Sequence, residues 1–293
     1  MAPQVVLITG CSSGIGLATA IHLARDSDKR FLVYATILGP IEKEVTFREA
    51  AGELLNATLF PVEMDVTSDD MVKNAVAMVM TQHGRIDILV NNAGVGVINV
   101  SEVASVEVAK KLFDINFFGM LRLTREVLPS MKKRRSGRII NISSNNGIFA
   151  FPYLGLYAAS KHAIEGFSQE IAIVCRFFNV WVSVIQPGPV NTAMRENIGA
   201  LGLGSVGEIL QNPDIDDVDK RLAEHFQDMH GLAVQPVDVA EVVKEAALAE
   251  KPHFRYQTSE HVQEFARKVF VDPTGDSIVD YQAELLEQNA PKC

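Results

Sequence analysis

The N-terminus joins a short apolar run, a glycine-rich turn and a helical pattern in immediate succession. The run from Val5 to Ile8 is apolar, three glycines lie between Thr9 and Gly16, and helical periodicity continues to Arg25. A strand that enters a helix through such a turn directs free backbone N–H groups and the positive end of the helix dipole at one point, where phosphate binds. The segment therefore predicts a dinucleotide-binding unit, with a ligand-free tight turn as the alternative.

Each glycine of this turn has a separate expected role. Gly10 permits the sharp exit from the strand, Gly14 lets the backbone approach a pyrophosphate, and Gly16 allows close packing of the helix. We therefore expect the phosphates of a dinucleotide at the start of the first helix.

Apolar strand patterns alternate with helical periods along the chain, which is typical of parallel βαβ units. The predicted strands are Val5–Thr9, Phe31–Thr36, Thr58–Val62, Ile86–Asn91, Arg138–Ser143, Trp181–Gln186 and Phe254–Thr258. The predicted helices are Ile15–Arg25, Ile41–Leu55, Asp69–Gln82, Val106–Arg134, Tyr157–Phe178 and Val237–Ala249. This order predicts an α/β fold: a single Rossmann-type doubly wound sheet of about seven parallel strands with helices on both faces.

We expect one dinucleotide-binding oxidoreductase domain over residues 1–293. Residues 190–235 contain five glycines, an acidic patch and little periodicity, so they predict a substrate lid after the sixth strand, with a plain surface loop as the alternative. Residues 259–293 form a C-terminal extension.

Charge and cysteine content restrict the partners. A net charge of −9 argues against nucleic acid, because binding to phosphates needs a basic surface. The basic cluster at Lys132–Arg135 ends a helical pattern, where cations stay solvated, with attachment to an anionic membrane surface as the alternative. Three scattered cysteines indicate neither a disulfide framework nor a metal site. The same cysteines indicate a reducing compartment, so we expect a cytoplasmic protein, with peripheral membrane contact as the alternative. No apolar run is long enough to span a bilayer.

Tyr157 and Lys161 are spaced for proton transfer. If this stretch is helical, a four-residue offset places the phenol and the ammonium on one face. A cation beside a phenol favours the phenolate and lowers the tyrosine pKa from about 10 toward neutrality. This pair is also common on helix surfaces, so by itself it allows a simple surface interaction.

Several motifs together carry a resemblance to a known family. They are Thr9-Gly10-x-x-x-Gly14-x-Gly16, Asp65-Val66, Asn91-Asn92-Ala93-Gly94, Asn116, Ser144, Tyr157-x-x-x-Lys161 and Pro187-Gly188. As a set they resemble the short-chain dehydrogenase/reductase family over nearly the whole chain. The segments DINFFGMLRL and HFRYQTSE resemble the branch of estradiol 17β-dehydrogenase type 1 and photoreceptor retinol dehydrogenase.

The resemblance implies roles for four catalytic residues. Tyr157 would exchange a proton with the substrate oxygen, and Ser144 would hydrogen-bond the same oxygen. We prefer Ser144 to Ser143 because successive strand residues face opposite sides. Lys161 would hold the nicotinamide ribose and lower the pKa of Tyr157. Asn116 would kink its helix or hold a water molecule, with a buried, satisfied amide as the alternative.

The resemblance also implies a set of cofactor-binding residues. Asp65 would meet the adenine ring, although such residues are often turn formers. The expected contacts are Thr9, Gly10, Ser12, Ser13, Gly14, Ile15, Gly16, Thr36, Asp65, Val66, Asn92, Ala93, Gly94, Tyr157, Lys161, Pro187, Gly188, Val190 and Thr192. No metal is implied.

The end of the second strand decides between NAD and NADP. Enzymes that use NAD place a carboxylate there, whereas those that use NADP place a cation. The stretch from Tyr34 to Gly39 carries neither, and Leu38 stands where close relatives usually have arginine. Ser12, Thr36 and Lys43 are candidate donors to a 2′-phosphate. We therefore expect NADP(H), with NAD as the alternative.

The expected substrate is a small apolar steroid or retinoid in an apolar cleft. His225 is spaced as a steroid-hydroxyl ligand by resemblance, and Glu284 lies one position from the expected partnering glutamate. Asn145 and Asn146 make the cleft more polar where relatives have small or apolar residues. We expect interconversion of estrone and estradiol, with all-trans-retinal and retinol, or a catalytically silent dinucleotide-binding protein, as alternatives. The resemblance also implies a homodimer through Val106–Arg134 and Tyr157–Phe178.

Overall fold

Strand β1 (Gln4–Ile8) is buried on both sides. Val6 and Ile8 face one apolar core, whereas Val5 and Leu7 face a second one. Successive strand side chains point to opposite faces, so a continuous apolar run suits a strand that is covered on both faces by helices. The structure, a computed structural model, describes residues 2–41, 44–192, 211–212, 215–216, 220 and 233–271.

The described residues form one parallel sheet of seven strands in the order β3-β2-β1-β4-β5-β6-β7. Besides β1, its strands are β2 (Phe31–Ile37), β3 (Leu59–Glu63), β4 (Ile88–Asn91), β5 (Gly137–Ile142), β6 (Val180–Gln186) and β7 (Arg255–Gln257). The predicted doubly wound sheet is therefore confirmed. The strand order reverses between β1 and β4, which is where such folds bind ligands at the carboxyl ends of the strands.

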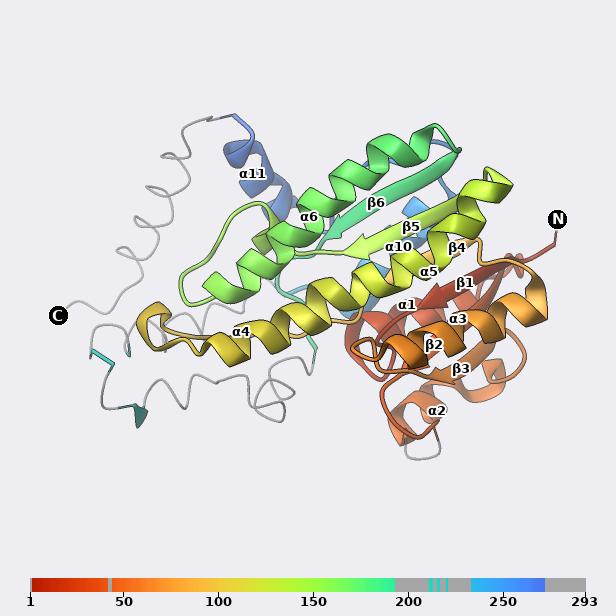
Figure 1. Cartoon of the computed structure of the whole chain (residues 1–293), viewed down its shortest axis with the longest axis horizontal. Coiled ribbons are helices and arrows are strands. Elements are labelled where there is room, and N and C mark those ends of the chain that lie inside the picture. The colour runs from red at the N-terminus through yellow and green to blue at the C-terminus, as the bar shows by residue number, and fades with distance from the viewer. Residues whose placement is uncertain are drawn as a thin grey trace.

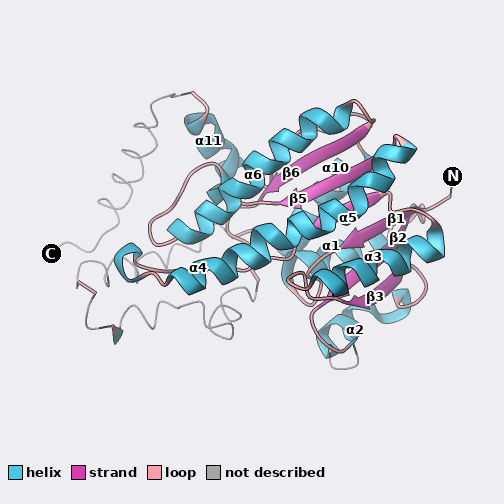
Figure 2. Ribbon diagram, in the orientation of Figure 1, coloured by secondary structure: helices cyan, strands magenta, loops and turns pink. Residues whose placement is uncertain are grey.

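Helices cover both faces of the sheet (Figures 1 and 2). They are α1 (Gly14–Ala24), α2 (Val45–Ala51), α3 (Asp69–His83), α4 (Val106–Phe113), α5 (Gly119–Arg134), α6 (Gly155–Arg176), α10 (Pro236–Leu248) and α11 (Glu260–Val269). In Figure 1, α3, α5 and α6 lie in front of the sheet, with α1 and α10 behind it. Leu23 of α1 and Val243 of α10 join the core behind, and Val76 of α3 and Leu123 of α5 join the core in front.

The long helix predicted over Val106–Arg134 is interrupted at its centre. Asp114–Phe118 form a π-helical turn between α4 and α5. Asn116 lies inside this turn and is buried. Such turns widen a helix by one residue and are frequent at functional sites. The kink or water contact expected of Asn116 stays a prediction.

Two parts of the prediction differ from the structure. The helix predicted over Ile41–Leu55 is shorter, because Gly52 has a φ of +48° and a 3-10 turn follows α2. Helix α11 was not predicted within the C-terminal extension. Its N-cap residue is Ser259, whose side chain accepts a hydrogen bond from Val262 N and so starts the helix.

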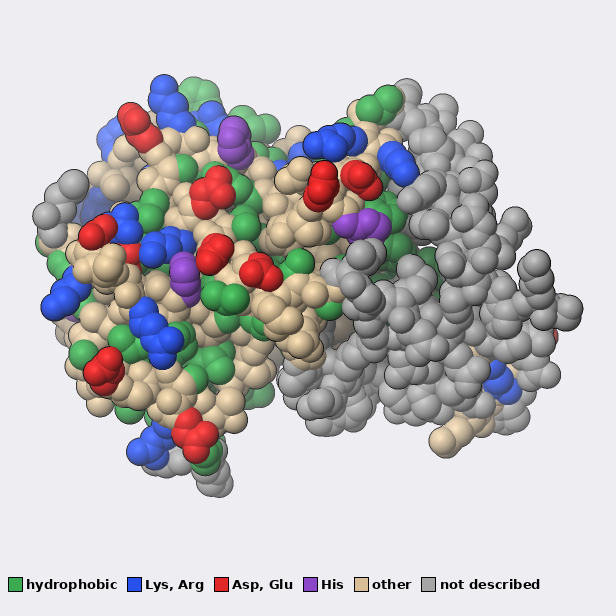
Figure 3. All heavy atoms as spheres, turned by 180° about the vertical axis from the view of Figure 1, so that it is seen from behind, with side chains coloured by type: hydrophobic (Ala, Val, Ile, Leu, Met, Phe, Trp, Pro, Cys, Tyr) green, Lys and Arg blue, Asp and Glu red, His purple; other side chains and the backbone are tan. Residues whose placement is uncertain are grey.

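The predicted lid at 190–235 lies largely outside the described residues, as does the extension beyond residue 271. On the face opposite that of Figure 1, acidic and basic side chains of the described residues intermingle (Figure 3). Among the described residues, no helix combines the length and the apolar character that crossing a bilayer requires.

Candidate active site

The turn after β1 approaches β4 too closely for side chains at two of its glycines. Gly10 has a φ of +70°, and a Cβ there would lie 2.8 Å from Ala93 Cα. A Cβ on Gly16 would overlap the carbonyl oxygen of Gly10 and the side chain of Asn92. Only glycine fits at these two positions, because the backbone of the turn lies so close to its neighbours. The start of α1 therefore packs directly against the residues that follow β4.

The first turn of α1 is open at its N-terminus. Ser13 is the N-cap residue, and its side chain makes no capping hydrogen bond. Gly14 has a φ of +59°, and a Cβ there would lie 3.2 Å from Thr192 Cγ2. A groove of about 480 Å³ begins at these three residues and continues along α1. Ser12 and Ile15 flank Ser13 and Gly14 in the chain and are half-buried. Open N–H groups next to a hydroxyl suit a phosphate.

Thr9 and Asn92 join the carboxyl ends of β1 and β4. Thr9 Oγ1 accepts hydrogen bonds from the backbone N–H groups of Asn92 and Ala93, both at 2.9 Å. The Asn92 side chain donates to the carbonyl oxygens of Thr9, at 2.8 Å, and Gly10, at 3.0 Å. These four bonds hold the glycine turn in place from one side.

Asn116 connects the π-helical turn to the segment after β4. Its Oδ1 accepts from Val95 N at 2.8 Å, and its Nδ2 donates to Val95 O at 2.9 Å and to Ser160 Oγ at 3.0 Å. A Cβ on Gly94 would lie 3.3 Å from Asn116 Oδ1 and 3.5 Å from Lys161 Nζ. The hydrogen-bonding groups of the Asn116 amide are therefore satisfied within the protein. The amide lies near Lys161 and connects the segment after β4 to α6.

Tyr157 and Lys161 lie together in the first two turns of α6. Lys161 Nζ lies 5.6 Å from the centroid of the Tyr157 ring and donates to the carbonyl oxygen of Ile142 at 2.9 Å. Ile142 is the last residue of β5, so this bond anchors the amine at the carboxyl end of the sheet. The structure thus brings the two expected side chains to one place.

The pKa values of this pair differ from the expectation. Burial raises the pKa of Tyr157 to about 12, and a hydrogen bond with Ser144 acts in the lowering direction. Burial lowers the pKa of Lys161 to about 8, and the charge of Glu165 acts in the raising direction. The pKa of Tyr157 is therefore raised and not lowered, because burial outweighs the hydrogen bond with Ser144.

Ser144 and Ser143 face different surroundings after β5. The hydroxyl of Ser144 meets that of Tyr157, and it accepts from Asn146 N at 3.1 Å. Ser143 Oγ points instead toward Gly147 on the side of Glu165, and it is buried without a hydrogen-bond partner among the described residues. The alternation of strand residues therefore separates the two hydroxyls as expected.

The segment that follows β6 borders the site on another side. A Cβ on Gly188 would lie 2.8 Å from Val262 Cγ2 of α11. Pro187 O accepts a hydrogen bond from Asn145 N at 2.8 Å, and Val190 pairs with Val234 in an isolated parallel bridge. This segment therefore lies between the Ser144 turn and α11.

The residues expected at the adenosine end have other contacts. Asp65 Oδ1 accepts from Thr67 N and Thr67 Oγ1, both at 2.8 Å, which is the turn-forming role. Val66 packs on Gly119, where an added Cβ would lie 2.8 Å from Val66 Cγ2. The contact explains the glycine directly after the π-helical turn.

Thr36 and Leu38 differ sharply in exposure at the end of β2. Thr36 is fully buried, and its hydroxyl accepts from Gly10 N at 3.4 Å, so it supports the glycine turn. Leu38 is 61% exposed. Lys43, His225 and Glu284 lie outside the described residues.

One buried network was not predicted from the sequence. Glu165 lies one helical turn after Lys161 and accepts from Gln186 Nε2 at 2.8 Å and from Arg255 Nε at 2.9 Å. Gln186 in turn accepts from Gln257 at 2.6 Å. The four-residue offset from Lys161 was the available sequence signal, but its partners on β6 and β7 follow only from the fold.

Aromatic side chains pack in a cluster between the segment after the Ser144 turn and α11. Phe149 stacks on Phe265 of α11 at 4.8 Å between centroids, and Phe151 meets Phe265 edge-on at 5.7 Å. His261 contacts the same ring edge-on at 4.8 Å. The contribution of α11 to this cluster was not predicted from the sequence.

Known proteins share both the sequence and this architecture. Retinol dehydrogenase 8 of Bos taurus is 37% identical over 287 residues, covering 95% of this chain and 88% of the relative. 17-beta-hydroxysteroid dehydrogenase type 1 of Homo sapiens is 38% identical over 284 residues, covering 95% and 84%. Both relatives belong to the branch that the sequence resembles, and that resemblance is confirmed.

Solved structures and a family model agree with these relatives. A short-chain dehydrogenase from Streptomyces avermitilis has a TM-score of 0.75 and 26% identity, covering 98% of this chain and 96% of that one. A variant of actinorhodin polyketide ketoreductase with NADPH has a TM-score of 0.68 and 26% identity, covering 87% and 96%. The model of the short chain dehydrogenase family matches residues 4–201. With the relatives above, this match shows that the chain belongs to the short-chain dehydrogenase family of oxidoreductases.

Proposed function

We propose that this oxidoreductase uses NADP(H) to interconvert a ketone and a secondary alcohol on a steroid, with estrone and estradiol as the pair. The observation that carries the proposal is the meeting of Ser144, Tyr157 and Lys161 at the carboxyl end of the sheet, close to the glycine turn. A proton donor, a second hydroxyl and an amine in one place are what carbonyl reduction requires.

Tyr157 is the proposed acid and base of the reaction. Its raised pKa keeps the phenol protonated at neutral pH, so it can give a proton to the substrate oxygen during reduction. In the oxidative direction, the same oxygen takes a proton back from the alcohol. Ser144 lies beside it and hydrogen-bonds the reacting oxygen in this proposal.

Lys161 and Asn116 support this pair. Lys161 is held by the carbonyl oxygen of Ile142, and Asn116 holds Val95 and Ser160 around it. We propose that Lys161 binds the ribose hydroxyls and that its charge favours the phenolate when the dinucleotide is present. Asn116 acts by positioning the helix that carries Tyr157.

The residues present fit a nicotinamide dinucleotide. Gly10 and Gly16 allow backbone segments to come too close for a side chain, and the first turn of α1 beyond Ser13 offers N–H donors beside Thr192. When bound, the nicotinamide supplies or accepts the hydride. Pro187 and Gly188 would hold its carboxamide end between the Ser144 turn and α11.

We propose NADP(H) rather than NAD because no carboxylate from Thr36 to Gly39 would repel a 2′-phosphate. Actinorhodin polyketide ketoreductase, a structural relative, holds NADPH. The burial of Thr36 leaves Ser12 as the described donor of the expected set, since Lys43 lies outside the described residues.

Leu38→Arg is expected to tighten NADPH binding by roughly 3- to 10-fold and to leave NADH binding nearly unchanged. The exposed position places a guanidinium at the end of β2, where it pairs with a 2′-phosphate but has no partner on a 2′-hydroxyl. Fluorescence titration with each dinucleotide measures the two dissociation constants. Equal changes for both dinucleotides would mean that the 2′ position lies elsewhere.

An apolar, rigid ligand suits the half-buried Phe151, which packs on the buried rings of Phe149 and Phe265 after the Ser144 turn. The similarity to 17-beta-hydroxysteroid dehydrogenase type 1 supports a steroid as the substrate. A retinoid is the second candidate, because the retinol dehydrogenase relative is similar over a larger share of its own length, 88% against 84%. Either substrate would place its carbonyl oxygen against Ser144 and Tyr157.

NADPH oxidation with estrone and, separately, with all-trans-retinal tests the proposed function. Turnover of estrone supports the steroid, and turnover of retinal alone replaces it by the retinoid. Binding of NADPH without turnover of either probe would point to a silent dinucleotide-binding protein. A panel of hydroxysteroids then defines the position of the oxidised carbon.

Reduction is expected to keep a constant kcat/KM from pH 6 to 7 and to decline above about pH 8. The pKa of Lys161, lowered to about 8, means that its positive charge is present below that pH and lost above it. Lys161→Arg is expected to remove the decline near pH 8, because a guanidinium stays protonated. A pH profile of both forms checks this, and an unchanged inflection in the arginine variant would assign it to another group.

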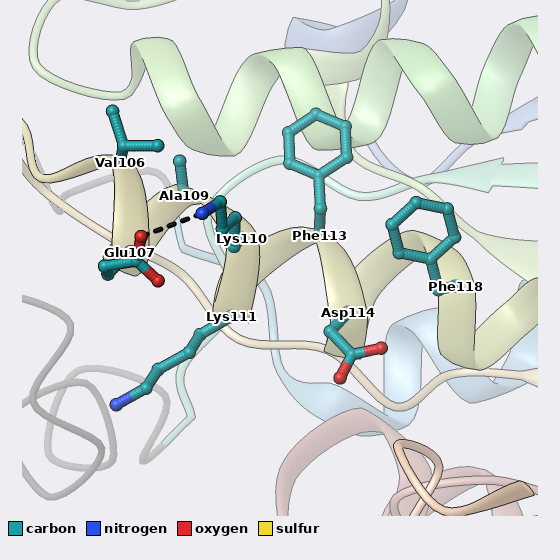
Figure 4. Close-up of a pocket in the computed structure, with 8 residues that line it drawn as sticks. All are labelled: Val106, Glu107, Ala109, Lys110, Lys111, Phe113, Asp114 and Phe118. Carbon is teal, nitrogen blue, oxygen red and sulfur yellow. Dashed lines mark hydrogen bonds and ion pairs between the residues drawn. The ribbon is translucent and has the colours of Figure 1, made fainter.

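We also propose that the protein forms a homodimer through the outer sides of α4, α5 and α6. Phe118, Ile173 and Phe177 are exposed there, with Phe177 at 75%. A groove of about 560 Å³ lies along α4, where Val106, Phe113 and Phe118 project from the same side of the helix (Figure 4). Clusters of exposed apolar side chains commonly mark protein interfaces.

Phe177→Glu is expected to convert a dimer into a monomer, because the substitution puts a charge into an apolar interface. Light scattering after size exclusion gives the mass of each form. Lys251→Glu, at an exposed position after α10 on the other side of the sheet, serves as a charge-changing comparison, and a monomeric wild type would remove the dimer proposal. We retain the cytoplasm as the proposed location, since Cys11 and Cys175 are both free.

A further inference from the structure

Two buried asparagines follow Ser144, and their amide orientations are determined by hydrogen bonds. Asn145 is 3% and Asn146 5% exposed. The backbone N–H of Phe151 donates to Asn146 Oδ1 at 3.3 Å, and Asn146 Nδ2 donates to Asn145 Oδ1 at 3.0 Å. An amide oxygen only accepts and an amide nitrogen only donates, so the bond from Phe151 sets the orientation of both side chains.

This chain of bonds also determines where the Ser144 proton lies. Ser144 Oγ is 3.0 Å from Asn145 Oδ1, and because Oδ1 carries no proton, Ser144 must be the donor. The hydroxyl accepts from Asn146 N at 3.1 Å. Its second acceptor, Pro187 O, is farther away at 3.5 Å. While Tyr157 is protonated, the proton of Ser144 therefore points to Asn145, and its remaining lone pair faces the Tyr157 hydroxyl. Ser144 must leave Asn145 before it can donate to a phenolate, which is the bond that lowers the pKa of Tyr157.

We propose that Asn145 is a positioning and specificity-determining residue that holds the Ser144 proton away from the substrate oxygen. The proposal rests on the proposed function. A lone pair on Ser144 accepts a hydrogen bond from an alcohol, whereas a ketone oxygen has no proton to offer it. The resting site therefore binds the alcohol in preference to the ketone.

The same arrangement affects the transition state. Negative charge develops on the substrate oxygen as hydride is transferred, and a donor is needed there. Ser144 must leave Asn145 before it can donate. Reduction and oxidation share one transition state, so freeing Ser144 raises kcat/KM in both directions by the same factor.

Asn145→Leu tests the proposal, because it removes the acceptor at similar volume. With NADPH and estrone, and with NADP and estradiol, kcat/KM is expected to rise roughly 3- to 10-fold, the effect of one released neutral hydrogen bond. Estradiol binding is expected to weaken relative to estrone binding. Asn146→Leu removes the donor that orients Asn145, so it is expected to give the same gain, and the double variant no further gain. All-trans-retinal and retinol replace the steroids if only the retinoid is turned over.

The Ser144→Ala background separates this role from a merely structural one. There, Asn145→Leu is expected to give no gain, because no Ser144 proton remains to be released. An unchanged or lower kcat/KM for Asn145→Leu in the wild-type background would overturn the proposal, as would an equal gain in the Ser144→Ala background.

A thermal unfolding cycle tests the hydrogen bond without any substrate. Ser144→Ala is expected to lower Tm by about 2 to 4 °C more in the wild type than in Asn145→Leu. If Asn145→Leu does not fold, Asn145→Ala replaces it in both experiments. Additive Tm shifts would overturn the proposal whatever the turnover. A wild type that reduces neither probe but shows coupled shifts would contradict the proposed function and leave the Asn145–Ser144 bond supported.

Discussion

Tyr157→Phe is expected to lower kcat/KM for ketone reduction by about 10²- to 10⁴-fold. The variant keeps the ring beside Lys161 and removes only the hydroxyl that meets Ser144. Dinucleotide affinity is expected to change by less than roughly threefold, because binding relies on the glycine turn and on Lys161. Steady-state kinetics with estrone or retinal, together with NADPH titration, measures both quantities.

Tyr34→Phe is the matched comparison for this variant. Tyr34 lies on β2, where its hydroxyl contacts Gln82 and His83 on α3, away from the proposed site. Its loss is expected to leave kcat/KM nearly unchanged. Equal activities of wild type and Tyr157→Phe would remove the proposed acid and base.

Gly16→Ala is expected to weaken dinucleotide binding by at least about tenfold and to lower the free energy of unfolding by about 1 to 3 kcal/mol. The new Cβ would overlap the carbonyl oxygen of Gly10, which is backbone and cannot rotate away, as well as the Asn92 side chain. Either the turn or the end of β4 must move. Chemical denaturation and NADPH titration measure the two effects.

Gly166→Ala provides a control with the same chemical change. Gly166 lies in α6, and an added Cβ would meet nothing within 4 Å. Alanine favours a helix over glycine, so this variant is expected to gain about 0.5 to 1 kcal/mol and to bind NADPH normally. If both variants behaved alike, close packing at Gly16 would not explain the glycine there.

Much of the fold follows from periodicity in the sequence. The run from Val5 to Ile8 is apolar at every position, and such a strand needs helices on both faces. The helix containing Tyr157 and Lys161 was predictable from the helical period of the apolar residues after Tyr157. The boundary of α2 was not, since it depends on the backbone conformation at Gly52.

The candidate site was only partly accessible to sequence reasoning. Spacing predicted that Tyr157 and Lys161 are neighbours, the family resemblance added Ser144, and the structure brings the three together. The direction of the Tyr157 pKa depends on how deeply its hydroxyl is buried, which spacing does not reveal. The orientation of the Asn145 amide depends, through Asn146, on the backbone N–H of Phe151, so no local pattern predicts it.

Helix α11 had a readable signal that was overlooked. Ser259 caps it, and Val262, Phe265 and Ala266 are buried at helical spacing. Helix α11 contacts Gly188 and Phe149 because β7, which precedes it, pairs with β6. That pairing belongs to the sheet and cannot be read from the sequence of α11.

A single-turnover experiment tests the central claim most directly, namely that Tyr157 delivers the proton while hydride is transferred. Enzyme saturated with NADPH is mixed with the ketone that the wild type reduces, and loss of NADPH absorbance is followed for wild type and Tyr157→Phe. Rapid loss is expected for the wild type and almost none for the variant, with NADPH bound to both. Equal rates of loss in the two proteins would contradict it.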